Sequence, residues 1–136
     1  MREKNPSDTA QPLRPAIILA GGQSLRMGGG HKALMPLGNG RVIDHVLARL
    51  RPQCSHLALS ANGDPALWQG LGLDLRPDSL PDYPGPLAGI LEGMEWAAAL
   101  GARHVLSVAA DTPFFPPDLY DRLAAQTRWV TYDMKP

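Results

Sequence analysis

Several features that would place a protein in a familiar class are scarce or missing in this chain of 136 residues. It has one cysteine, Cys54, so no internal disulfide can form, which fits a reducing cytoplasm. Its 13 basic and 13 acidic residues cancel, so bulk charge implies no basic face for a nucleic-acid polymer. No apolar run approaches the length that spans a bilayer. The sequence therefore predicts a cytoplasmic protein with neither a nucleic-acid nor a membrane partner.

Two well-known kinds of site motif are also absent. The four histidines, at positions 31, 45, 56 and 104, have no paired spacing, so a zinc site is not supported. A P-loop requires Gly-Lys-Ser/Thr, but Lys32 follows His31 and precedes Ala33. The dinucleotide fingerprint requires a third glycine three residues after Gly30, where Ala33 stands instead. A phosphate cradle in this chain is therefore of another kind.

A glycine-rich segment over residues 21–32 nevertheless has the chemistry of an anion site. It follows the apolar run 16–20, which is typical of a strand buried on both faces. Glycines let backbone N–H groups approach an anion, and Arg26 and Lys32 add positive charge beside them. Loops at the carboxyl ends of parallel strands bind phosphorylated ligands in open α/β folds. We expect a nucleotide or sugar-nucleotide phosphate here; the alternative is that the glycines only turn the chain.

The rest of the chain alternates predicted strands with predicted helices. This alternation predicts right-handed βαβ units and a three-layer α/β domain, in which a mainly parallel sheet lies between helices. Residues 1–14 are expected to form a disordered tail, and residues 15–136 the domain. Because a strand at the end of the chain should feed further structure, we expect the C-terminal part of the domain to be absent. Strands are predicted at 56–60, 73–75, 104–110 and 128–131, and helices at 42–50, 65–70, 87–100 and after Pro116-Pro117, with Leu119 and Leu123 buried.

Polar residues follow several of the predicted strands. Asp111 closes the strand 104–110, where a carboxylate would enter the crevice of the glycine-rich segment and bind Mg²⁺; the alternative is a turn cap. Ser60 and Asn62 follow the strand 56–60 and would hydrogen-bond a base or ribose, unless they are turn residues alone. Residues 85–89 place two glycines around a helix N-terminus, which offers backbone donors, although proline-rich loops are usually connectors.

Together these segments resemble the molybdenum cofactor guanylyltransferases of the nucleotidyltransferase superfamily. The resemblance covers roughly residues 15–132. It implies a Rossmann-like nucleotidyltransferase fold and the transfer of GMP from GTP to molybdenum-bearing molybdopterin, with release of pyrophosphate and a need for Mg²⁺. The matching motifs are residues 19–28 with Lys32, Asp78-Ser79, Gly85-Pro86-Leu87-Ala88-Gly89 and Asp111-Thr112-Pro113.

The resemblance also implies the site residues and the partners. Catalysis would depend on Arg26, Lys32 and Asp111, which offset the repulsion between two phosphates, with Mg²⁺ held by Asp111. The implied partners are GTP, molybdopterin, other cofactor-biosynthesis proteins and the molybdoenzymes that accept the product. Ser60 stands where the family commonly has an asparagine. The GTP contacts that the resemblance implies are Leu19, Ala20, Gly21, Lys32, Asp78 and Asp111, and the further candidate contacts are Gly22, Ser60, Asn62 and Gly85.

Two other functions stay open at this point. One keeps the class of enzyme but changes the substrate, to a cytidylyltransferase or a sugar-1-phosphate nucleotidyltransferase. The pair Gly21-Gly22 favours guanine, because related cytidylyltransferases tend to have Leu-Ala-Ala-Gly there. The other alternative is a non-catalytic remnant that binds a nucleotide without turnover.

Overall fold

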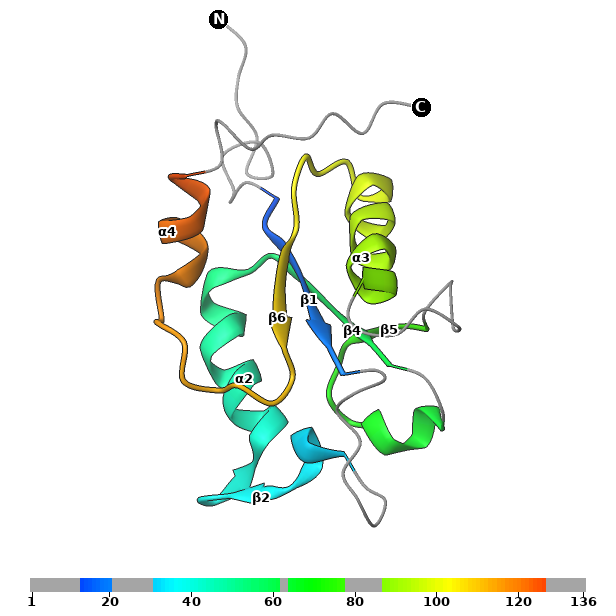
Figure 1. Ribbon diagram of the computed structural model, residues 1–136, viewed down its shortest axis with the longest axis vertical. Helices are drawn as coiled ribbons and strands as arrows, with labels where there is room; N and C mark the ends of the chain where they lie inside the picture. The colour runs from blue at the N-terminus through cyan, green and yellow to red at the C-terminus, as the bar shows by residue number, and fades with distance from the viewer. Residues whose placement is uncertain (1–12, 21–30, 62–63, 78–86, 127–136) are drawn as a thin grey trace, which may run out of the picture.

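A four-stranded parallel sheet forms the centre of the computed structural model, which describes residues 13–20, 31–61, 64–77 and 87–126. The strands lie in the order β5-β4-β1-β6, so the strand that comes first along the chain lies inside the sheet (Figure 1). Every pairing in this sheet is parallel. The strands are β1 (Pro15–Leu19), β4 (His56–Ser60), β5 (Asp74–Arg76) and β6 (Leu106–Ala109).

Helices cover both faces of this sheet and give the domain three layers (Figure 1). Successive side chains of β1 point to opposite faces of the sheet. Ile18 packs in the core beneath α2 and α4, and Ile17 packs against Trp96 of α3. The predicted three-layer α/β fold is confirmed. No helix in the described part of the chain is long and apolar enough to cross a bilayer. One face carries α2 (Val42–Leu50), α4 (Leu119–Ala124) and the 3₁₀ helices η3 (Arg51–Gln53) and η4 (Pro65–Trp68), and the other carries α3 (Leu87–Ala99).

Helix α2 has the bounds that the apolar spacing predicts. At its start, Asp44 accepts the Arg41 guanidinium Nε–H (3.1 Å) and the Arg41 backbone N–H (2.9 Å). These bonds hold the pKa of the Asp44 carboxyl below its usual range. The helix is preceded by a hairpin of β2 (Pro36–Leu37) and β3 (Gly40–Arg41). This hairpin was not predicted from the sequence. Its turn contains Gly38 at φ +62°, a conformation that favours glycine.

Helix α3 packs on the sheet through small residues. The apolar spacing that predicts the helix includes Leu87 and Leu91, yet these side chains are 63% and 37% exposed. Gly89 and Gly93 face the sheet instead, and a Cβ at Gly93 would lie only 2.6 Å from Ile17 Cγ2. The spacing therefore locates the helix, whereas close contact between backbone and sheet selects its buried face.

Two expectations are corrected near the amino ends of the strands. The sequence predicts Leu123 on the buried side of α4, but it is 44% exposed and Tyr120 is buried in its place. The Tyr120 hydroxyl donates to Pro15 O (3.1 Å) and so covers the start of β1. Arg14, expected in the tail, instead pairs with Asp121 (2.6 Å) and lies over the Tyr120 ring. Residues 1–12 and the predicted strand 128–131 lie outside the described residues.

Candidate nucleotide site

The parallel register brings four strand ends into one row at the carboxyl edge of the sheet. Leu19 of β1 pairs with Ser60 of β4 and with Ala109 of β6, and Ser60 pairs in turn with Arg76 of β5. The backbone N–H of Ala20 extends the pairing by donating to Ser60 O (2.8 Å). In open α/β sheets, the crevice outside this edge is the usual place for a ligand.

The cation and the carboxylate predicted for this crevice meet just beyond the end of β6. Lys32 begins the 3₁₀ helix η2 (Lys32–Leu34), and Asp111 follows β6 by two residues. Lys32 Nζ lies 3.8 Å from Asp111 Oδ2, and the two side chains are 47% and 26% exposed. An ion pair this long and this exposed contributes little to stability, so both charges are available to a ligand.

The first turn of α3 packs directly on the ends of β1 and β4. A Cβ at Gly89 would lie 2.7 Å from Ser60 Oγ and 2.9 Å from Leu19 Cδ2. Glycine at this position therefore lets the N-terminal turn of α3 lie at the crevice, where its backbone carries partial positive charge. Ser60 is 1% exposed, because this turn covers it.

The structure describes only some of the residues predicted for the site. Those that it describes all lie at the carboxyl edge: Leu19, Ala20, Lys32, Ser60 and Asp111. Their contacts with GTP stay predictions. The other predicted site residues lie outside the described residues: Gly21, Gly22, Arg26, Asn62, Asp78 and Gly85.

Asp111 has the chemistry of a Mg²⁺ ligand. Its carboxylate supplies hard oxygen donors, and its partial exposure of 26% leaves room for metal-bound water. Across the described ranges, no group of three or more His, Cys, Asp or Glu side chains is placed to hold a metal. Mg²⁺ takes one or two carboxylates and completes its shell with water and phosphate oxygens, and its binding by Asp111 stays a prediction.

One ion pair at this edge was not predicted from the sequence. Arg76 donates from Nε (2.9 Å) and from Nη2 (2.6 Å) to Oε2 of Glu92, an α3 residue that is 8% exposed. The available signal was the spacing of Glu92, four residues from both Ala88 and Trp96 on the buried face of α3. A charged residue in that position requires a partner on the sheet.

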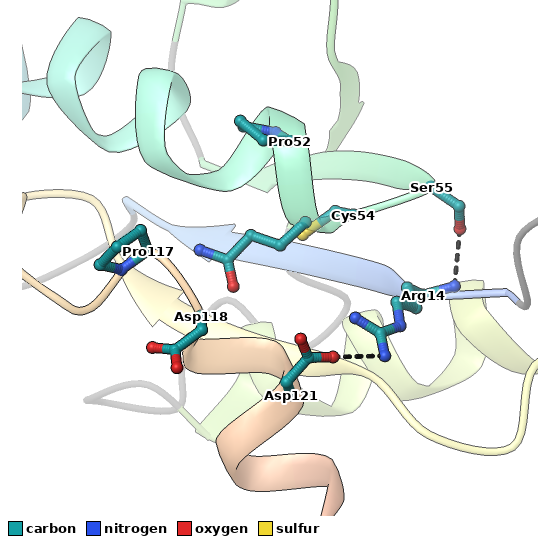
Figure 2. Close-up of a pocket in the computed structure, with 8 residues that line it drawn as sticks. Arg14, Pro52, Cys54, Ser55, Pro117, Asp118 and Asp121 are labelled. Atoms are coloured by element: carbon teal, nitrogen blue, oxygen red, sulfur yellow. Dashed lines mark hydrogen bonds and ion pairs between the residues drawn. The ribbon is translucent and has the colours of Figure 1, made fainter.

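A pocket at the amino ends of β1 and β4 differs from this crevice (Figure 2). Its polar groups are bonded to protein neighbours: Ser55 Oγ accepts the Arg14 backbone N–H (2.6 Å), and Gln53 Oε1 accepts the Tyr120 backbone N–H (2.8 Å). Burial raises the pKa of the Cys54 thiol to about 11, so this cysteine stays protonated near neutral pH and is a poor nucleophile. We interpret the pocket as structural. It is lined by Arg14, Pro52, Gln53, Cys54, Ser55, Pro117, Asp118 and Asp121.

The fold and the residues at the carboxyl edge of the sheet together indicate the class of protein. A parallel α/β sheet with an exposed lysine, a partly exposed carboxylate and a helix N-terminus at its carboxyl edge is typical of nucleotide-binding domains of the open-sheet type. Comparison with known families narrows this class. The profile of the MobA-like NTP transferase domain matches residues 16–133, and the chain belongs to that family.

Curated relatives and solved structures agree with this assignment. The chain is 56% identical over 113 residues to the molybdenum cofactor guanylyltransferase of Mesorhizobium japonicum, a match that covers 82% of this chain and 54% of that protein. The protein of the same name from Bradyrhizobium sp. is 49% identical over 113 residues, with 82% and 53% covered. A nucleotidyl transferase from Methanothermobacter thermautotroptrophicus has the same fold, with a TM-score of 0.66, 22% identity, and 85% and 58% covered. The chain thus spans about half the length of the curated relatives it matches.

Proposed function

We propose that this chain carries the nucleotide site of a molybdenum cofactor guanylyltransferase, which transfers GMP from GTP to molybdenum-bearing molybdopterin and releases pyrophosphate. The observation that carries the proposal is the meeting of Lys32 and Asp111 just beyond the end of β6. The names of relatives 56% and 49% identical to the chain support the choice of nucleotide and acceptor. The need for Mg²⁺ and a cytoplasmic location belong to the same proposal.

Charge is the main obstacle in this reaction, because an acceptor phosphate must approach the α-phosphate of GTP in line while pyrophosphate leaves. The Lys32 ammonium binds phosphate oxygens and stabilises the negative charge that develops on the leaving group. Mg²⁺, when bound, supplies further neutralisation of the phosphates, and Asp111 is the described residue that would hold it. The acceptor is a phosphate monoester with a second pKa of about 6, so it is largely dianionic near neutral pH and requires no general base.

The pairing of Lys32 with Asp111 also prepares the site before a nucleotide arrives. At 3.8 Å the ammonium and the carboxylate partly neutralise each other. Each charge therefore exerts a weaker force on the other groups around it. Because both side chains are partly in water, phosphate oxygens replace the carboxylate as the partner of Lys32 at little cost. Asp111 is then available to a cation that accompanies the phosphates.

Thermal unfolding of the chain with GTP, CTP, UTP or ATP in the presence of Mg²⁺ tests the proposal. Ligand at a hundred times its Kd adds about 2.7 kcal/mol to the stability of the protein that binds it, which raises the unfolding midpoint by several degrees. Stabilisation by GTP above the other nucleotides is the expected result. Stronger stabilisation by CTP or UTP would indicate a different nucleotidyltransferase.

A second measurement separates binding from turnover. Pyrophosphate release from GTP is followed with molybdopterin present, and Asp111→Asn serves as the inactive control. GTP binding without acceptor-dependent pyrophosphate release would reduce the proposal to a nucleotide-binding role.

A further inference from the structure

Arg76 stands at the carboxyl edge on the same face of the sheet as Ser60. The two residues are register partners in parallel strands, so their side chains point to the same side. On that side, α3 covers Ser60 at Gly89 and meets Arg76 at Glu92. The guanidinium therefore borders the crevice at its β5 end.

The charged end of the crevice lies at the opposite end of this row. Asp111, paired with Lys32, follows β6, whereas Arg76 ends β5, and β4 and β1 lie between them. Three strand spacings of about 4.8 Å separate the two ends by roughly 14 Å. From β6, the described part of the edge extends across β1 and β4 to β5. A nucleotide with its phosphates at Lys32 and Asp111 that lies along this edge carries its nucleoside toward Arg76.

Glu92 orients the Arg76 guanidinium and cancels its charge. Both hydrogen bonds end on the same carboxylate oxygen, with the Glu92 side chain 10% exposed and the Arg76 side chain 39% exposed. The bonds use the Nε–H and one N–H of Nη2, which leaves the second Nη2 donor and both Nη1 donors for another partner. Since the pair is neutral as a whole, it suits an uncharged acceptor better than a phosphate. Guanine presents two such acceptors, O6 and N7, and a guanidinium matches both.

We propose that Arg76, positioned by Glu92, donates hydrogen bonds to O6 and N7 of the guanine base of bound GTP and so contributes to the choice of nucleotide. The inference rests on the proposed function, because it takes GTP as the nucleotide. It gives Glu92 the part of a positioning residue, which acts only through Arg76.

The ion pair between Arg76 and Glu92 also holds α3 against β5. The test therefore needs a control variant that weakens the contact between α3 and β5 without changing Arg76. Trp96 Nε1 donates to Asp74 Oδ2 (3.4 Å), which is a second polar contact between the same two elements. Asp74 is two residues before Arg76 on β5 and therefore lies farther from the carboxyl edge. Asp74→Leu removes this contact and serves as the matched control.

The test variant combines Arg76→Met with Glu92→Met. Removing both partners leaves no buried carboxylate without a counter-charge, so the fold is expected to survive. Isothermal titration with Mg²⁺ present gives the Kd of GTP and of 7-deaza-GTP, which lacks the N7 acceptor. The parent chain is expected to bind GTP about tenfold more tightly than 7-deaza-GTP. The double variant should bind the two within about twofold of each other, and Asp74→Leu should keep the parent ratio.

The outcomes separate this inference from the proposed function. A folded double variant that keeps the parent ratio overturns the inference, and so does a parent chain that binds both nucleotides equally; GTP binding itself would still support the function. A parent chain that binds CTP in preference to GTP would overturn both.

Discussion

The two edges of the sheet use polar residues in opposite ways. At the amino edge, Arg14 pairs with Asp121 at 2.6 Å, and the Tyr120 hydroxyl donates to the backbone of Pro15. At the carboxyl edge, Lys32 and Asp111 face each other at 3.8 Å and stay partly in water. Polar groups bonded to one another hold elements together, whereas loosely paired charges exchange partners at little cost. Arg76 and Glu92, at 2.6 Å, are paired as closely at the carboxyl edge as Arg14 and Asp121 are at the amino edge. The comparison therefore teaches that the loose pair Lys32–Asp111, and not the carboxyl edge as a whole, marks the place where charges can change partners.

Removing the carboxylate at the binding edge should have the largest effect. Asp111→Asn keeps an oxygen ligand but loses the charge proposed to hold Mg²⁺, so the proposed GMP transfer is expected to fall about 100-fold or more. The unfolding midpoint should stay close to that of the parent, because the pair with Lys32 is exposed. Pyrophosphate release measures the loss. Asp118→Asn in the amino-edge pocket is the control, and equal turnover in the two variants would remove Asp111 from the site.

Replacing one cationic side chain at each edge should separate residues that bind GTP from residues that stabilise the fold. Lys32→Met is expected to raise the Kd for GTP by about 10- to 100-fold, the usual value of a hydrogen bond to a charged group, with little change in unfolding. Arg14→Met should do the reverse, since it loses a contact with the Tyr120 ring and an ion pair, at a cost of about 1 kcal/mol. Titration calorimetry and thermal unfolding of both variants check this crossed pattern. Loss of GTP binding in Arg14→Met would contradict the division between the edges.

Two glycines of α3 sharpen the comparison within a single helix. A Cβ at Gly89 meets Ser60 and Leu19 at the binding edge, and a Cβ at Gly93 meets Ile17 in the core. Both alanine variants should lose about 1–2 kcal/mol of stability, because overpacking exceeds the gain in helix propensity. Only Gly89→Ala should also weaken GTP binding, by a few-fold. Equal nucleotide affinity in the two variants would show that the first turn of α3 does not border the ligand.

Alkaline pH should produce the smallest effect, and at the amino edge. Burial raises the pKa of Cys54 from 9.0 to about 11 and raises that of Tyr120 as well. Between these values the unfolded chain has released protons that the folded chain still holds, so stability falls as the pH rises from 9 to 11. Unfolding midpoints across this range should decrease, and less steeply in Cys54→Ala. An identical slope in that variant would contradict the burial of the thiol.

The sequence was sufficient for elements in which regular spacing and pairing agree. Helix α2 and strand β4 lie at 42–50 and 56–60, as predicted. The predicted strand 104–110 is shorter in the structure, because only residues 16–19 of β1 are paired with it. The buried face of α3 was not predictable from hydrophobicity, since Gly89 and Gly93 mark it by having no side chain.

The candidate site also contains one pair of residues that the sequence predicts and one that it does not. The meeting of Lys32 and Asp111 followed from topology, because parallel strands end at one edge of their sheet. The pairing of Arg76 with Glu92 could not be predicted from topology, because it depends on which turn of α3 faces β5. That orientation is selected by close packing across the whole helix, which no local pattern of residues records.

The position of β1 inside the sheet has a consequence for synthesis of the protein. β1 precedes the other described strands, but it needs β6 on one side and the Tyr120 hydroxyl at its start, and Tyr120 comes 105 residues after Pro15. Translation at about 5–20 residues per second makes this interval roughly 5–21 s. Until then Ile17 and Ile18, fully buried in the folded domain, lack the part of their surroundings that β6 and α4 provide. The central strand of the sheet is thus made first and completes its pairing and packing only after most of the described chain has been synthesised.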